Sequence, residues 1–256
     1  MNINLEHFFK RVLNYFNTLF LFLMGADWVY TEHKMKRGGH RMRIDYKKLI
    51  TEYIAEQNYT GIVEIGQENN AKALRYVQMN IWGDYRKELR WYALSALEAL
   101  AKEFASRYDE VYRNVIRRAV WAMADESGNV PWAAPEMMAV VIKACPAQYR
   151  EFVKIMVHNG LDSPMCHHGV LWAVGYLGAE YLTELEPFIP KLMKFLDSSD
   201  NELRGLAVWA LKRLHYVPAF DRINKMTDDD AITWIYEDGI LQQKTISQIL
   251  TETNSI

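Results

Sequence analysis

The chain has 256 residues, of which 50% are hydrophobic and 24% are charged, with 13 Gly and 7 Pro. That apolar fraction excludes intrinsic disorder, and the scarcity of Gly and Pro disfavours an all-β fold with many tight turns. A formal net charge of -2 provides no overall basic field that would recruit nucleic acid. The two cysteines, Cys145 and Cys166, are too few for a disulfide framework and favour a cytoplasmic location.

The N-terminal region contains an apolar stretch at residues 12–24, which includes Asn14 and Asn17. It is shorter than the roughly 18–20 apolar residues of a spanning helix, so we expect no membrane segment. Residues 37–39 are Arg-Gly-Gly, which the codons AGG-GGA-GGT can encode as a ribosome-binding sequence just upstream of Met42. We therefore expect residues 1–41 to be a translated leader, with an ordinary N-terminal helix as the alternative.

One pattern recurs along the middle of the chain. The sequence R-x-x-A-x-x-A-L-x-x-L occurs at residues 90–100 and again at 204–214, and looser versions occur at 167–177 and 116–126. Their first positions extend from residue 90 to residue 204, which corresponds to three periods typical of paired-helix repeats. Further amphipathic segments are predicted between them, at residues 71–82, 136–144, 148–158 and 187–196. The sequence therefore predicts an all-α fold, an α-solenoid of HEAT-like helix pairs at residues 42–217.

The region after residue 217 has a different pattern. Two alternating runs between Ile232 and Thr245 flank Asp238-Gly239, a strong β-hairpin signal. Thr245 is a suitable N-cap for a short helix that ends near Leu250. We therefore expect residues 218–256 to form a small C-terminal β-hairpin followed by a short helix.

The repeats resemble the HEAT-like repeats, including those called phycobilisome-lyase HEAT-like. Residues 121–136, WAMADESGNVPWAAPE, resemble the W-x-x-x-D-E-S-G-G-I-x-W-x-x-P-E signature of an uncharacterised HEAT-like family found mainly in sulfate-reducing and similar anaerobic prokaryotes. Asn129 stands where that family has a second glycine. The resemblance implies a helical solenoid and brings no known activity with it.

Large aromatic side chains recur on one face of the predicted repeat helices. The sixth position of the pattern is Ser95, Trp121, Trp172 and Trp209, about 150° from the buried stripe of small and apolar residues. Either these side chains line a concave groove for a ligand or partner, or a long connection or the C-terminal hairpin covers them. The same face adds Trp91, Tyr92, Arg117, Arg118, Asp125, His168, Tyr176 and Arg213.

The segment from Asp125 to Glu136 is a second candidate site. Glu126 occupies a core position of the pattern, where a carboxylate is costly unless it has a partner. We expect the loop, which includes Trp132, to fold back so that these carboxylates lie near Arg117, Arg118 or His168. Loop bracing and ligand contact both remain open as roles for this segment.

Metal and nucleophile sites have weak support. Asp125, Glu126, Glu136 and His168 could converge on an ion only through the loop, and the chain lacks Cys-x-x-Cys and His-Glu-x-x-His spacing. No sequence motif supports catalysis by Cys166 with a histidine base. A lone cysteine is commonly a buried core residue. We predict no metal, no cofactor and no catalytic residue.

We predict a non-enzymatic scaffold that binds another protein or a peptide segment in the aromatic groove. One alternative is a cofactor-binding or lyase-type protein that holds a tetrapyrrole, with Arg117 or Arg118 on its propionates. Another is a HEAT-like DNA-binding protein or DNA glycosylase, against which the net acidic balance argues. The sequence indicates neither a ligand's identity nor an oligomeric state.

Overall fold

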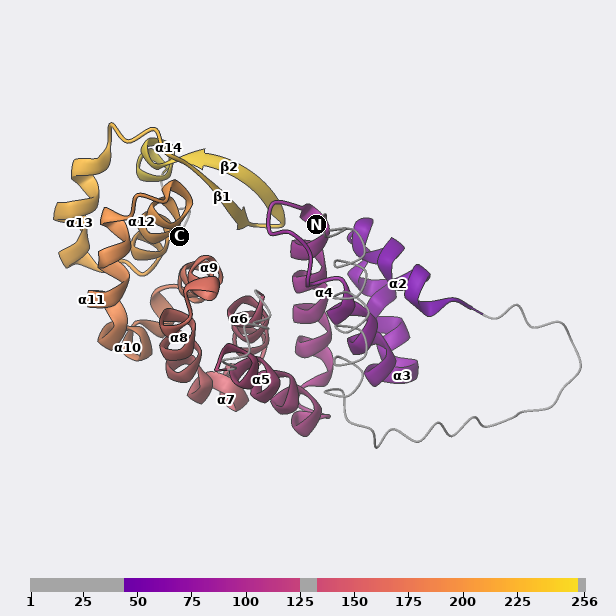
Figure 1. Ribbon diagram of the computed structural model, residues 1–256. Helices are drawn as coiled ribbons and strands as arrows, with labels where there is room; N and C mark the ends of the chain where they lie inside the picture. The colour runs from indigo at the N-terminus through magenta and orange to yellow at the C-terminus, as the bar shows by residue number, and fades with distance from the viewer. Residues whose placement is uncertain (1–43, 125–132, 253–256) are drawn as a thin grey trace, which may run out of the picture. The chain divides into compact units, whose positions relative to one another are not determined.

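The computed structural model describes residues 44–124 and 133–252. The predicted leader and the greater part of the loop after Asp125 lie outside the described residues. Within them the chain is helical apart from one β-hairpin (Figure 1). The longer helices are α2 Tyr46–Ala55, α3 Tyr59–Met79, α4 Glu88–Phe104, α5 Asp109–Met123, α6 Ala134–Ala144, α8 Val153–Asp162, α9 His167–Leu177 and α12 Asn201–Arg213. The shorter elements are α7 Pro146–Tyr149, α10 Leu182–Leu185, α11 Ile189–Leu192, α13 Val217–Ile223, β1 Ile232–Glu237, β2 Ile240–Thr245 and α14 Ile246–Thr251, with 3-10 turns at Arg150–Phe152, Pro164–Cys166, Ala179–Tyr181, Glu186–Phe188, Met193–Asp197 and Asn224–Met226.

The helices pack as successive pairs, as in an α-solenoid. Helices α4, α6, α9 and α12 are consecutive neighbours and form one row, which we call the inner row (Figure 1). Helix α5 packs against α6 and α8, and the 3-10 turn Met193–Asp197 packs against α12. This arrangement confirms the predicted α-solenoid.

One predicted repeat helix belongs to a different row. The pattern at residues 116–126 falls largely on α5, whereas the inner row takes α6 at that place. Helix α5 matches the pattern because it also buries a stripe of small and apolar residues, among them Ile116, Ala119 and Met123. Periodicity identifies the buried stripe of a helix but not the member of the pair to which the helix belongs.

The buried stripe of the inner row lies where the sequence predicts it. In α4, Ala93, Leu97 and Leu100 are fully buried, and in α12 Ala207 and Leu211 are fully buried. These side chains belong to one continuous hydrophobic core that also includes Ile235 and other residues of the C-terminal segment. The helices and the hairpin therefore share a core.

Helix α3 is longer than predicted and contains a break. The pattern predicts a helix over residues 71–82, whereas α3 begins at Tyr59 and ends at Met79. At Asn69 the backbone is extended (φ -158°, ψ 91°), and its side-chain Oδ1 accepts a hydrogen bond from the Lys72 N–H at 2.9 Å. Asn69 thus caps the second half of α3, which begins close to the predicted start.

The C-terminal hairpin forms as predicted. Strands β1 and β2 pair antiparallel, with Ile232 opposite Thr245 and Glu237 opposite Ile240. Asp238 and Gly239 have φ values of +51° and +81°, as a two-residue turn with both residues in the left-handed region requires. Thr245 then caps α14 through a capping box with Gln248.

The hairpin lies across the inner row. Strand β1 packs against α12, and β2 contacts α4 (Figure 1). Next to α12, Thr233 Oγ1 donates a hydrogen bond to the Glu202 carbonyl at 3.0 Å. Thr233 can approach α12 this closely because residue 205 is a glycine, and a Cβ there would overlap the threonine side chain. The other end of the hairpin reaches Ser95 of α4, whose hydroxyl lies 2.7 Å from that of Tyr236.

A helical glycine allows α9 and α12 to pack closely. A Cβ on Gly175 would overlap the Trp209 ring. We expect Gly175→Ala to lower the free energy of unfolding by about 1–3 kcal/mol, because overpacking outweighs the higher helix propensity of alanine. Urea unfolding followed by circular dichroism measures the change. Gly83→Ala, in the exposed bend before α4, is the control for an added methyl group without overlap, since a Cβ there would meet its nearest neighbour only at 3.9 Å, and a loss as large in that variant would contradict the packing argument.

Candidate functional site

The hairpin covers the aromatic face of the inner row. The Tyr236 ring stacks on Trp91 with centroids 5.1 Å apart and an interplanar angle of 16°. Trp172 Nε1 donates a hydrogen bond to the Tyr236 carbonyl at 2.9 Å. Trp91, Trp172 and Trp209 are 3%, 2% and 4% exposed. An open groove at these three residues is therefore wrong, and the alternative, cover by the C-terminal hairpin, is confirmed.

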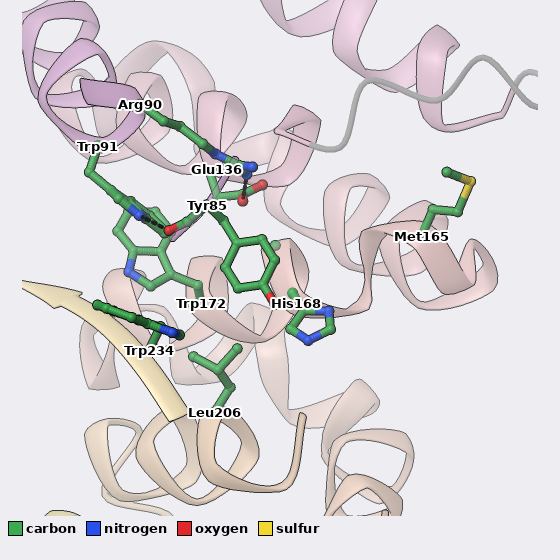
Figure 2. Close-up of a pocket in the computed structure, with 10 residues that line it drawn as sticks. Tyr85, Arg90, Trp91, Glu136, Met165, His168, Trp172, Leu206 and Trp234 are labelled. Carbon is green, nitrogen blue, oxygen red and sulfur yellow. Dashed lines mark hydrogen bonds and ion pairs between the residues drawn. The ribbon is translucent and has the colours of Figure 1, made fainter. Parts of the chain in front are cut away.

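A pocket remains open beside the hairpin. Its volume is about 210 Å³, and its lining comes from the inner row, from β1 and from the segments before α4 and α9 (Figure 2). The lining residues are Tyr85, Arg90, Trp91, Glu136, Met165, His168, Gly169, Trp172, Leu206 and Trp234. We call this the Trp pocket.

An ion pair lies at the inner end of the Trp pocket. Arg90 from α4 donates a hydrogen bond through Nη2 to Glu136 Oε1 from α6, and the two side chains are only 3% and 2% exposed (Figure 2). Arg90 Nη1 also donates to the Gly83 carbonyl at 3.2 Å. Burial raises the pKa of the Glu136 carboxyl, and the neighbouring guanidinium opposes that rise. The pair places a charged donor and a charged acceptor together in the core.

The second oxygen of Glu136 has no hydrogen-bond partner among the described residues. It lies against Gly169 of α9, where any Cβ would overlap the carboxylate. The glycine thus makes room for Oε2 beside the lining of the pocket. A buried acceptor of this kind costs free energy until a donor reaches it.

The mouth of the Trp pocket is polar. Tyr85 Oη donates to Glu202 Oε2, and Arg86 Nη2 lies 2.8 Å from Glu202 Oε1. The His168 ring lies against that of Tyr85, with centroids 5.2 Å apart, and its Nε2 is 3.5 Å from Glu202 Oε2. Burial raises the pKa of Tyr85 to about 12 and lowers the pKa of His168, so both groups are neutral at pH 7.

Four of the predicted site residues meet in the Trp pocket, namely Trp91, Glu136, His168 and Trp172. Tyr176 stacks on Trp172, with centroids 4.7 Å apart, and like Trp209 it is not part of the lining. The remaining predicted residues lie elsewhere or outside the described part of the chain. Arg117, Arg118 and Trp121 are exposed on α5, away from the lining, and Asp125, Glu126 and Trp132 lie outside the described residues.

The predicted partner of Glu136 is corrected. We expected Arg117, Arg118 or His168, whereas Glu136 pairs with Arg90. The recurring pattern placed residues 116–126 with the other repeat helices, but α5 belongs to the other row, so its arginines lie away from the pocket lining. Arg90 opens the repeat pattern, which marks it in the sequence, although the pattern does not indicate that its side chain points into a pocket.

No sequence pattern marks four further residues of the lining, Tyr85, Met165, Leu206 and Trp234. Tyr85, Met165 and Leu206 follow no period that would single them out. Trp234 sits in the alternating run of β1, so the sequence places it on one face of the hairpin without indicating what that face contacts. Only the packing of β1 against α12 brings Trp234 to the lining.

Neither cysteine has the environment of a nucleophile. Both are buried, and burial raises the pKa of Cys166 to about 11. The reactive form is the thiolate, which such a pKa suppresses at neutral pH. Within residues 44–124 and 133–252, no three His, Cys, Asp or Glu side chains come together as a metal ligand set.

In residues 44–124 and 133–252, no helix combines the length and the apolar character that a membrane crossing requires. Comparison with curated proteins and with solved structures gives no match. Residues 164–214 match the family model of the HEAT-like repeat. This match extends from the turn before α9 to the end of α12 and so includes half of the Trp pocket, with Met165, His168, Gly169, Trp172 and Leu206. The fold and this match together identify a HEAT-like repeat in an α-solenoid.

Proposed function

We propose that this chain is a non-enzymatic HEAT-like repeat scaffold that binds a segment of a partner protein at the Trp pocket. The observation that carries the proposal is the pocket itself, which combines large aromatic walls with a buried acceptor that has no partner among the described residues. Binding hot spots are enriched in such desolvated aromatic pockets with few polar groups. Repeat solenoids use the face of one helix row as a recognition surface.

The rim of the pocket also fits a protein partner. Met165 and Ile232 are 46% and 49% exposed, and they flank the pocket and the polar depression at its mouth. An apolar rim beside a deeper pocket provides contact area for the residues that flank an anchoring side chain. The partner segment would thus place one side chain in the pocket and lie over Met165 and Ile232.

The two alternative functions have less support. The Trp pocket by itself has a volume of about 210 Å³, below the range of roughly 300–1,000 Å³ for sites of drug-sized ligands, so it could enclose only part of an open-chain tetrapyrrole. Arg117 lies on α5 and pairs with Glu110, so it is not placed to hold propionates or phosphates at the pocket. We therefore do not propose tetrapyrrole or DNA binding.

Selection of peptides from a random phage-display library on the full chain tests the proposed function. We expect a convergent peptide motif, and we expect Met165→Trp to weaken binding of the selected peptide about tenfold or more by filling the mouth of the pocket. Isothermal titration calorimetry measures the affinities. A mouth substitution is used because truncating the buried Trp91 or Trp172 would disturb the core.

The matched control for Met165→Trp is Ile155→Trp. Ile155 is 41% exposed on α8 and does not line the pocket, so the same added ring should leave the affinity within about twofold. Absence of a convergent motif, or equal weakening by both variants, would contradict binding at the Trp pocket.

A further inference from the structure

The buried acceptor beside the Trp pocket indicates what kind of group its ligand carries. Glu136 Oε2 is buried and has no partner among the described residues, while Oε1 is held by Arg90. In its ionised form, which the Arg90 guanidinium favours against the effect of burial, this carboxyl can only accept hydrogen bonds. Residue 169 is a glycine, and a Cβ atom at that position would overlap this oxygen. The ligand group that completes the site is therefore a hydrogen-bond donor.

The walls favour a donor that is also a cation. The rings of Tyr85, Trp91, Trp172 and Trp234 all line the pocket (Figure 2). Aromatic faces carry negative charge density and attract ammonium and guanidinium groups, most strongly where water is excluded. The protein itself has this contact at the pocket, because the Arg90 guanidinium lies 5.6 Å from the centre of the Trp91 ring.

With Glu136 ionised beside Arg90, the charges around the pocket have a net negative sign. The carboxylates of Glu136, Glu202 and Asp200 line the pocket or its polar mouth, against the guanidinium groups of Arg90 and Arg86. His168 adds no charge at neutral pH, since burial lowers its pKa. A cation entering the site would bring these groups to neutrality.

The polar depression at the mouth shares Tyr85 and His168 with the Trp pocket. Its volume is about 420 Å³, and it offers side chains of Asp200 and Glu202 and an exposed Ile232. The backbone of a partner segment can lie there while one long side chain extends toward Glu136.

We propose that the Trp pocket receives a lysine or arginine side chain of the partner segment, whose charged end donates a hydrogen bond to Glu136 Oε2 between the tryptophan rings. This inference rests on the function proposed above and specifies the chemistry of the anchoring residue. The aliphatic stem of that side chain would contact Trp234 and Leu206, and its charge would lie at the inner end of the pocket.

The peptides selected on the full chain provide the first test. We expect one lysine or arginine to be indispensable, so that its replacement by norleucine weakens binding to the wild-type chain about tenfold or more. On the Glu136→Gln variant the same replacement should cost less than about threefold, because the carboxylate charge is gone. Selected peptides that bind equally well with norleucine would overturn the inference while leaving the proposed function intact.

A pair of small probes tests the inference on the wild-type chain alone. We expect n-butylammonium to change the tryptophan fluorescence saturably and to displace a selected peptide, and n-butanol at the same concentrations to do neither. Equal effects of the two probes, or none from n-butylammonium, would overturn the inference. These titrations remain decisive if Glu136→Gln does not fold. Putrescine is included as a free amine, and a preference for it over the peptide would also contradict a side chain as the occupant.

Discussion

Replacement of Glu136 by leucine should lower the free energy of unfolding by about 3–5 kcal/mol, because the buried Arg90 guanidinium would then lose the carboxylate that balances its charge. Arg90 is 3% exposed, so water does not replace the lost carboxylate. Urea unfolding at pH 7, followed by circular dichroism, measures the loss.

The double variant Arg90→Met/Glu136→Leu is the control for this prediction. It removes both charges and fills the space with apolar side chains, and it should recover most of the stability. Arg90→Met alone should cost less than Glu136→Leu, because burial raises the pKa of the Glu136 carboxyl, which can take up a proton and become neutral, whereas the guanidinium stays charged. A double variant no more stable than the two singles would mean that the carboxylate is required for shape and not for charge.

Trp172→Ala should lower the free energy of unfolding by about 3–5 kcal/mol, whereas Trp121→Ala should change it by less than about 1 kcal/mol. The two tryptophans occupy the same position of the repeat pattern, but Trp172 is 2% exposed beneath the hairpin and Trp121 is 53% exposed on α5. Truncation of Trp172 leaves a cavity between Trp91 and Tyr176 and removes the hydrogen bond to the Tyr236 carbonyl.

The same urea experiment serves both tryptophan variants, with fluorescence as a second readout. The native spectrum of Trp172→Ala should lose a buried, blue-shifted contribution, and that of Trp121→Ala an exposed one. Equal losses of stability would mean that α5 packs like the inner row, which would contradict the assignment of α5 to the other row.

The sequence was sufficient to predict the architecture, because local sequence patterns determine the helices and the hairpin. The buried stripe with Ala93, Leu97 and Leu211 follows from helical periodicity alone, and the hairpin follows from alternation around Asp238-Gly239. The role of Thr245 as a cap follows from its spacing to Gln248. Each of these features depends on residues that are close together in the chain.

The site was only partly predictable because it depends on contacts between distant segments. Helical periodicity indicated a special face with Trp91 and Trp172 but left two alternatives for that face, and only the stacking of Tyr236 on Trp91 decides between them. The partner of Glu136 is 46 residues away, on a helix whose place in the rows no local pattern reveals. Pairing across such distances is a tertiary property that helical periodicity does not encode.

The hairpin across the inner row has a consequence for how the protein unfolds. In an ordinary solenoid each repeat contacts only its neighbours, so the ends can fray while the middle stays folded. Here β1 lies on α12 while Tyr236 and β2 reach α4, so the last helix of the row and its first are joined through one element. Loss of either end breaks the same set of contacts, which couples the repeats into a single cooperative unit. The long sequence separation of those contacts also makes their formation a late and slow event in folding.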